Sequence, residues 1–342
     1  MTRTRSLFVP LALLALVGVS TGVVACGGSS SDDGADGTEN VTLLLDWSPN
    51  TNHSGIYIAQ ERGWYDDAGL DVSIKAPGET SNTQLLGAGK ADLAISVQEE
   101  ITPARAEGIP VVSVAAIIQH NTSSLLSLAE DGIDGPADLP GKTYGGYGGQ
   151  LEEALVKQLI SCAGGDPDEF ESVNVGEDDF RIGLTRNRYD YVWIFDAWDG
   201  IRLHDSDELP TRSIHFLDHT DCIPDWYTPL IVASEKMIEQ RPEVLRKFLA
   251  ATSRGYQEAM KDPSAAVDAL MAAAPELDRD LVTRSADYLS TRYSDDPAAW
   301  GRQERAVWTR FTAFLRTAGL IEGDFDDSAA YTNDFLPKAS SS

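Results

Sequence analysis

The amino-acid sequence predicts a two-lobed α/β protein in which each lobe is a mostly parallel sheet flanked by helices. Strand-like and helix-like segments alternate along two successive stretches of the chain, a pattern typical of parallel sheets with crossover helices. The part of the chain with folding potential, 41–337, is too long for one small domain and suits two lobes. The last third reads as helices without a sheet of their own, so we expect it to pack back on the first lobe.

The first stretch follows a β-α-β-α-β order. A short apolar run opens it and predicts a buried strand, and the next strand alternates polar and apolar residues. The predicted strands are 41–45, 70–75, 91–96 and 111–119, and the helices predicted between them are 55–62 and 81–87.

The second stretch starts after the turn-rich segment 131–141 and repeats the alternation. Its strands are predicted at 142–144, 172–175, 191–195 and 214–217, and a long helix is predicted at 150–163. A further strand at 228–233 leads back to the first lobe. We therefore predict a first lobe of 41–125 plus 228–337 and a second lobe of 126–227, with chain crossings near 125 and 228. A cleft between two such lobes, outside the carboxyl ends of the strands, is where these folds bind small molecules.

Four helices are predicted after the return strand. Pro242 stands near the start of one of them, and Asp262-Pro263 ends one helix and begins the next. The four predicted ranges are 242–261, 263–274, 278–290 and 301–318.

The N-terminus has the pattern of an export signal. Arg3 and Arg5 precede an uncharged run of apolar and small residues at 7–24, and Cys26 follows the small residue Ala25. The aliphatic–small–Cys order resembles the bacterial lipobox, which implies cleavage before Cys26 and lipidation of its sulfur. The alternative is a transmembrane anchor, since the run has about the length of a bilayer span.

We therefore predict a signal peptide at 1–25, a lipidated Cys26 and a flexible tether at 26–40, which is polar and cannot bury much surface. The protein is then expected outside the cytoplasm, lipid-anchored to the outer face of the cell membrane, and in contact with the membrane through this anchor only. A formal net charge of −27 disfavours nucleic acid and anionic lipid headgroups as partners.

Cys162 and Cys222 are the two cysteines left in the folded part. Outside the cytoplasm they are candidates for a disulfide, and the alternative is a pair of buried thiols. The chain contains no Cys-x-x-Cys, so we expect neither a redox centre nor a zinc site.

The first candidate binding segment, DWSPNTNHSG, lies between the first strand and the first helix. Asp46, Trp47, Asn50 and His53 offer a carboxylate, an indole for stacking, an amide and an imidazole. Loops on a rigid scaffold commonly carry function, which favours a binding site. The alternative is a capped turn, in which the polar side chains serve the start of the helix.

The second candidate is the glycine loop at 144–149 with Glu152. Its glycines, Gly146 and Gly148 among them, let a ligand approach the backbone beside Tyr147. The spacing differs from a dinucleotide fingerprint, and no Lys or Arg follows as in a phosphate loop. Glu152 either accepts hydrogen bonds from a neutral or cationic ligand or favours the helix N-terminus through its dipole.

The third and fourth candidates are WIFDAWDG at 193–200 and DWYTP at 225–229. Trp193 and Phe195 share one face of a strand, and Asp196 and Trp198 follow at its end. Core packing accounts poorly for two tryptophans beside two acids. Tyr227 stands at the second crossing, where it either closes on a ligand or lies buried under the hinge.

Five segments carry a resemblance to known proteins: LLLDWSPNTNHSGIYIAQERGWYDDAGLDV, LLGAGKADLAIS, YGGYGGQLEEAL, YVWIFDAWDGI and DWYTPLIVASEKMI. They resemble the solute-binding lipoproteins of bacterial ABC importers that carry thiamine pyrimidine precursors, in the SsuA/THI5-like (NMT1-like) group of periplasmic binding proteins. The resemblance covers about residues 41–260, and this group is related to the yeast-type pyrimidine-precursor synthase.

The resemblance implies a type II periplasmic-binding-protein fold with two hinge crossings. It also implies a cleft for N-formyl-4-amino-5-aminomethyl-2-methylpyrimidine or its hydroxymethyl analogue, permease subunits as partners, no cofactor, no metal and a monomer. An aminopyrimidine is flat and carries an exocyclic amine, so aromatic faces and carboxylates suit it. The expected ligand-binding residues are Asp46, Trp47, Asn50, His53, Tyr57, Gln98, Gly146, Tyr147, Gly148, Glu152, Trp193, Phe195, Asp196, Trp198 and Tyr227.

Two other functions remain open. The resemblance includes synthases that use a histidine in the first-lobe loop as a reactant together with a cysteine-rich iron-binding segment. His53 lies in a comparable loop, but this chain has no cysteine cluster, so we do not expect an enzyme. The same fold also binds riboflavin, sulfonates or taurine; the acids and aromatics argue against the anionic solutes, because anion sites favour helix amides and cations.

Overall fold

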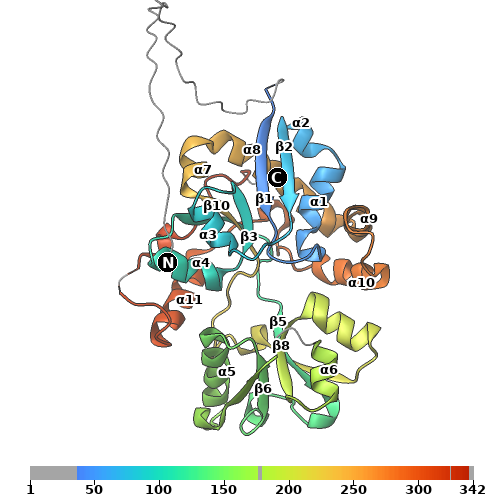
Figure 1. Ribbon diagram of the computed structural model, residues 1–342, viewed down its shortest axis with the longest axis vertical. Helices are drawn as coiled ribbons and strands as arrows, with labels where there is room; N and C mark the ends of the chain where they lie inside the picture. Colours follow the sequence, from blue (N-terminus) through green and yellow to red (C-terminus); the bar gives the residue numbers. More distant parts are fainter. Residues whose placement is uncertain (1–36, 176–178, 324, 339–342) are drawn as a thin grey trace, which may run out of the picture. The chain divides into compact units, whose positions relative to one another are not determined.

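The computed structural model describes residues 37–175, 179–323 and 325–338. The predicted signal peptide, Cys26 and most of the tether lie outside the described residues. Two five-stranded sheets flanked by helices form the folded part (Figure 1), which confirms the predicted α/β fold. Within the described residues, no helix combines the length and the apolar character that a bilayer span requires.

The first sheet has the order β2-β1-β3-β10-β4. β1 runs parallel to both β2 and β3, while β10 is antiparallel to β3 and β4, so four of the five strands point the same way. The aliphatic residues of β1 are buried in the core of this lobe, as the apolar run predicts. The strands are β1 (Glu39–Leu44), β2 (Leu70–Lys75), β3 (Leu93–Ser96), β4 (Val111–Ala116) and β10 (Leu230–Ser234).

The second sheet has the order β7-β6-β8-β5-β9, and β5 is its reversed strand. The predicted lobe boundary at 125 is wrong, because Ser123, Ser124 and Leu125 already pair within this sheet. The serines of β5 look like a linker in the sequence, yet all six residues of the strand are buried. The strands are β5 (Ser123–Leu128), β6 (Thr143–Gly146), β7 (Glu171–Asn174), β8 (Tyr191–Phe195) and β9 (Thr211–His215).

Helices cover the sheets (Figure 1). Those not predicted from the sequence are α2, α4, α6, α7 and two five-residue π-helical segments, Asp196–Gly200 and Arg202–Ser206. The α-helices are α1 (Ser54–Glu61), α2 (Trp64–Asp67), α3 (Asn82–Gly87), α4 (Gln98–Ala106), α5 (Gln150–Cys162), α6 (Phe180–Thr185), α7 (Glu235–Gln240), α8 (Pro242–Lys261), α9 (Pro263–Ala273), α10 (Arg279–Ser290) and α11 (Arg305–Thr317).

The last helix corrects the expectation that the C-terminal third packs only on the first lobe. Val307 and Trp308 of α11 belong to the core around β3, β4 and β10. Phe311 and Leu315 of the same helix belong to the core of the second sheet, where Phe311 stacks on Trp226 at 5.4 Å between ring centroids. α11 therefore packs against residues of both lobes.

The contact of α1 with α8 depends on two glycines. A Cβ atom at Gly255 would lie 1.9 Å from the carbonyl oxygen of Gly55, and one at Gly55 would lie 2.3 Å from the ring of Tyr256. Both distances are below van der Waals contact, so glycine is required for this close helix crossing.

We expect Gly255→Ala to destabilise the protein by about 1–3 kcal/mol or more, because the added methyl group must push the two helices apart. Chemical denaturation followed by circular dichroism measures this change. Gly78→Ala is the matched control, since nothing lies within 4 Å of a Cβ there. Equal stability of the two variants would contradict the close crossing.

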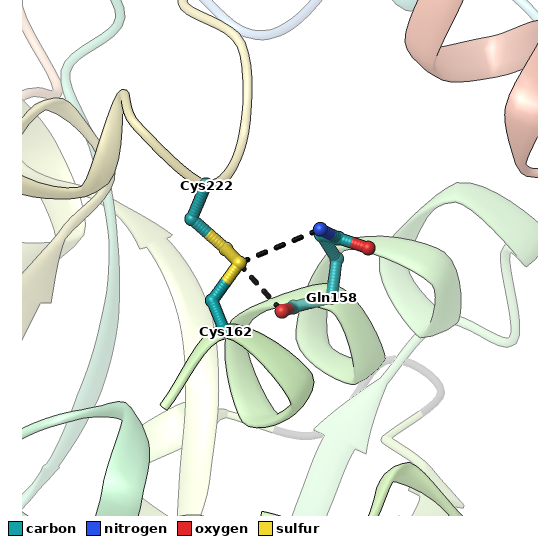
Figure 2. The surroundings of a disulfide bond; sticks show 3 residues. All are labelled: Gln158, Cys162 and Cys222. Atoms are coloured by element: carbon teal, nitrogen blue, oxygen red, sulfur yellow. Dashed lines mark hydrogen bonds between the residues drawn. A yellow bond between two sulfur atoms is a disulfide. The ribbon is translucent and has the colours of Figure 1, made fainter. Parts of the chain in front are cut away.

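A disulfide joins Cys162 at the end of α5 to Cys222 in the segment after β9 (Figure 2), with their Cα atoms 6.0 Å apart. The Nε2 of Gln158 donates a hydrogen bond to Cys162 Sγ at 3.4 Å, and Cys222 Sγ lies 3.3 Å from the Gln158 carbonyl oxygen. The bridge ties the return segment to the second lobe shortly before the chain crosses back.

The two chain crossings lie side by side. The outward crossing, 117–122, joins β4 to β5, and the return crossing leads from β9 to β10. The Asn121 N–H donates to Asp225 Oδ1 at 2.9 Å, and the Ile117 N–H donates to the carbonyl oxygen of Pro229 at 3.0 Å. Hydrogen bonds thus hold the two hinge segments to each other.

Candidate functional site

The loop after β1 contains a capped turn at Asn50. The Asn50 Oδ1 accepts a hydrogen bond from the Asn52 N–H at 2.9 Å, and its Nδ2 donates to the Ser48 carbonyl at 3.0 Å. Asn50 is buried. Its amide therefore organises the start of the helix, which is the alternative role considered for this residue.

His53 is completely buried behind this loop and holds Asp46. Its Nδ1 faces the Asn50 N–H at 3.3 Å and must accept, so the proton is on Nε2, which donates to Asp46 Oδ1 at 2.8 Å. Tyr57 is buried in the core of the first lobe, where burial raises the pKa of its hydroxyl and Glu276 adds to the shift. His53 is thus held by local hydrogen bonds, and Tyr57 by packing in the core.

Three predicted site aromatics are exposed at the carboxyl ends of strands. Trp47 follows β1 and is 67% exposed, Tyr147 follows β6 and is 59% exposed, and Phe195 ends β8 and is 37% exposed. The parallel strands of each sheet share one carboxyl edge, which is the edge where α/β folds bind ligands. These rings have large free faces, whereas most aromatics of the protein are buried.

Glu152 holds the glycine loop after β6. Its Oε2 accepts from the Tyr147 N–H at 2.9 Å, and a Cβ at Gly146 would lie 2.6 Å from the same oxygen. Burial raises the pKa of the Glu152 carboxyl, and the loop N–H groups oppose this rise. Gly148 has φ of +80°, which only glycine adopts readily. The loop therefore owes its shape to Glu152, and Tyr147 is the side chain it leaves exposed.

Asp199, the second acid of the WIFDAWDG segment, is not among the expected ligand-binding residues. Burial and the nearby Asp179 raise the pKa of its carboxyl to about 6, although Arg202 opposes them. Burial raises the pKa of the Tyr147 hydroxyl, and Asp199 and Glu152 add to the rise, so the three groups lie near one another. This end of the second sheet combines an exposed ring with two carboxyl groups whose pKa values are raised.

Three side chains donate hydrogen bonds to the Asp196 carboxylate. Ser124 Oγ donates to its Oδ1 at 2.7 Å, His215 Nδ1 donates to its Oδ2 at 3.0 Å, and the Tyr288 hydroxyl of α10 donates at 3.4 Å. Asp196 raises the pKa of the His215 imidazole. Asp196 therefore links β5 and β9 to α10.

Trp198 lies beside the first lobe. It and Ala197 pack against the core of the first lobe, next to α10. The π-helical segment that follows β8 turns these side chains toward the first lobe, a change of direction that the strand-like sequence pattern did not reveal. Trp198 therefore contributes to the contact between the lobes.

Of the two aromatic residues in the return crossing, Tyr227 is buried under the hinge and Trp226 contacts α4. Tyr227 is buried, and its hydroxyl accepts from the Glu304 N–H at 2.7 Å, which is the alternative of an aromatic under the hinge. Trp226 Nε1 donates to Glu99 Oε2 at 3.0 Å, and its ring meets Trp193 of β8 edge-to-face at 5.9 Å. Glu99, which the sequence did not single out, thus reaches the aromatic cluster of the second lobe.

His120 joins the two crossings to the first lobe. Its Nδ1 lies 2.6 Å from Asp225 Oδ2, and its Nε2 lies 3.4 Å from Asp295 Oδ2. The hydrogen bond to Asp225 raises the pKa of the imidazole to about 9, with a smaller contribution from Asp295. Both ring nitrogens therefore carry protons at neutral pH.

We expect the stability contributed by His120 to be complete below about pH 6.5 and to be lost as the pH rises through about 9, because its folded pKa is raised. Asp225→Asn keeps the acceptor for the Asn121 N–H and should lower the pKa of His120 toward 6.5. NMR titration of the imidazole measures the shift. An unchanged pKa in this variant would show that Asp225 does not hold the imidazolium.

Sequence comparison identifies relatives over most of the chain. The family described as NMT1/THI5 like matches residues 50–266. A formylaminopyrimidine-binding protein of Halalkalibacterium halodurans is 29% identical over 307 residues, covering 86% of this chain and 89% of the relative. A 4-amino-5-hydroxymethyl-2-methylpyrimidine phosphate synthase of Legionella pneumophila is 29% identical over 303 residues, covering 87% of this chain and 92% of the relative.

Comparison with solved structures identifies proteins that share the fold of this chain. The periplasmic aliphatic sulphonate binding protein SsuA from Escherichia coli superposes with a TM-score of 0.67 at 16% identity, covering 85% of this chain and 91% of that protein. This likeness confirms the predicted two-lobed periplasmic-binding-protein fold.

Proposed function

Because the chain belongs to the NMT1/THI5-like family, we propose that it is the solute-binding component of an ABC importer and that its solute is a thiamine pyrimidine precursor. N-formyl-4-amino-5-aminomethyl-2-methylpyrimidine and hydroxymethylpyrimidine are the two candidates. The observation that carries the proposal is the set of exposed rings, Trp47, Tyr147 and Phe195, at the carboxyl ends of three strands. The name of the Halalkalibacterium relative supports the choice of solute.

The chemistry of the second-lobe edge supports a neutral, amine-bearing solute. A flat heterocycle buries both faces against aromatic rings, and base–aromatic stacking of this kind contributes roughly 1–3 kcal/mol. Glu152 and Asp199, whose pKa values burial raises, offer hydrogen-bond acceptors to the exocyclic amine of such a solute. A sulfonate or taurine would meet carboxyl groups at this edge, which weakens the case for an anionic solute.

A synthase is the second candidate, because several relatives are named as pyrimidine phosphate synthases. His53 is the residue that a histidine-consuming synthase would need. Its two ring nitrogens are occupied by Asn50 and Asp46, and its ring is completely buried. We therefore favour binding without reaction, and we expect peptide mass mapping of the protein to show His53 chemically intact.

The proposed role includes a location and partners. The N-terminal signal pattern and Cys26 support export and lipid anchoring to the outer face of the cell membrane. The protein then acts as a monomer that delivers solute to the permease subunits of the importer. Globomycin, which blocks lipoprotein signal cleavage, should leave the uncleaved chain in the membrane.

A thermal-shift panel tests the solute assignment. At a hundredfold excess over Kd a bound solute stabilises the folded protein by about 2.7 kcal/mol. We expect the melting temperature to rise with formylaminopyrimidine or hydroxymethylpyrimidine and to stay constant with taurine and riboflavin. A rise with taurine or riboflavin alone would overturn the proposed solute.

A further inference from the structure

The start of α4 carries two polar side chains that reach the return crossing. Gln98 and Glu99 follow the carboxyl end of β3 after one intervening residue. Gln98 Oε1 accepts from the Tyr227 N–H at 2.8 Å, and Glu99 Oε2 accepts from Trp226 Nε1 at 3.0 Å. Both side chains are therefore oriented by neighbouring residues of the same hinge segment.

Each of these side chains keeps hydrogen-bonding capacity that the described residues do not use. Gln98 Nε2 is buried, and no described residue accepts its two N–H bonds. Within the described residues Trp226 is the side chain that donates to Glu99, on Oε2, and the backbone N–H of Glu99 itself also acts on the carboxyl group. A carboxyl group has about four acceptor positions, so capacity for a ligand remains. Trp193 Nε1 of the neighbouring aromatic cluster is likewise buried without an acceptor among the described residues.

Burial raises the pKa of Glu99 to about 8, and the charge of Glu100 adds to this rise. Among the described residues, Glu100 is the titratable group that acts on Glu99. At neutral pH Glu99 is therefore mainly a carboxylic acid, with an O–H donor on one oxygen and an acceptor on the other.

We propose that Glu99 is a specificity-determining residue that recognises the amine-bearing edge of an aminopyrimidine. Its Oε1–H donates to a ring nitrogen, and its Oε2 accepts from the adjacent exocyclic amine while still accepting from Trp226. Gln98 Nε2 supplies a further donor beside it. This inference rests on the proposed function, since it names the group that selects the solute within the same site.

The proposed pairing of Glu99 with the aminopyrimidine follows from complementary hydrogen-bond donors and acceptors. The edge of a 4-aminopyrimidine presents one acceptor and one donor side by side, and a neutral carboxyl group presents the matching donor and acceptor. A sulfonate presents acceptors only, so it leaves the Glu99 carbonyl oxygen without a second donor. A buried polar group left unpaired in this way disfavours the wrong solute.

Two substitutions of Glu99 distinguish the hydrogen bonds of its carboxyl group from the volume of its side chain. Glu99→Gln keeps one acceptor and one donor and can still accept from Trp226, so affinity for hydroxymethylpyrimidine should stay within about threefold. Glu99→Leu removes both hydrogen bonds and should weaken this affinity by about 10- to 100-fold. Glu107→Gln, which changes an exposed acid at the other end of α4, is the matched control and should bind like the parent protein.

The desamino analogue of hydroxymethylpyrimidine supplies the decisive comparison by isothermal titration calorimetry. The parent protein should prefer the amino compound at least about 10-fold, and Glu99→Leu should lose this preference, a readout that a general loss of stability does not produce. Above pH 8 the parent protein should bind more weakly as Glu99 ionises, while Glu99→Gln should show no such decline.

The experiment distinguishes a failure of the proposed function from a failure of the role proposed for Glu99. If the parent protein does not bind hydroxymethylpyrimidine or its formylamino relative, the proposed function fails. If the parent protein binds but Glu99→Leu keeps both the affinity and the preference for the amino compound, the role of Glu99 is overturned while the solute assignment stands.

Discussion

Replacing Trp47 by alanine should weaken binding of the pyrimidine by about 5- to 150-fold and leave the stability of the unliganded protein nearly unchanged. The range corresponds to the roughly 1–3 kcal/mol that a stacking aromatic contributes. Stability should not suffer, because the indole is 67% exposed and buries little surface on folding. Calorimetric titration and thermal unfolding of the same preparation measure the two quantities.

Val173→Ala is the matched control for this substitution. Val173 is also an exposed large apolar residue, at 40%, but it lies within β7 rather than beyond the end of a strand. It should change neither affinity nor stability appreciably. An unaltered Kd in Trp47→Ala would remove the indole from the site, and a large fall in its melting temperature would make Trp47 a packing residue.

Removing the disulfide should have the largest effect on stability. Cys162 and Cys222 are 60 positions apart, and closing a loop of that size lowers the entropy of the unfolded chain by an amount equivalent to about 4 kcal/mol. The double substitution to serine should therefore lower the free energy of unfolding by up to this value, as measured in urea.

Two controls accompany this experiment. The parent protein treated with a reductant should lose stability to a similar extent, and the double variant should not respond to the reductant. A loss below about 1 kcal/mol would mean that other contacts restrain the return segment equally well. The burial of Ile223 in the core of the second lobe and the hydrogen bond from Asn121 to Asp225 are two such restraints.

Most elements of the fold could be predicted from hydrophobic periodicity. The strands at 70–75 and 191–195 and the helix at 242–261 match the structure in both bounds. β5 could not be recognised, because its serines resemble a polar linker and their burial depends on the strands beside them. The pattern of α11 shows an apolar face, but no local signal states that this face contacts two lobes.

For the candidate site, the sequence identifies segments rich in binding side chains but not the surroundings of each residue. Sequence shows which side chains can bind a ligand, but not which of them the fold already satisfies. His53, Asp196 and Tyr227 find partners far along the chain or within their own turn. Glu99 looks like half of a solvated acidic pair, and only the position of Trp226 reveals its different environment.

A crystal structure of the protein with hydroxymethylpyrimidine tests the central claim most directly. We predict the ring in contact with the face of Trp47 and with an aromatic of the second lobe, and its amine edge within hydrogen-bonding distance of Glu99. A pyrimidine bound away from the carboxyl ends of both sheets, with Trp47 still exposed to solvent, would contradict the account.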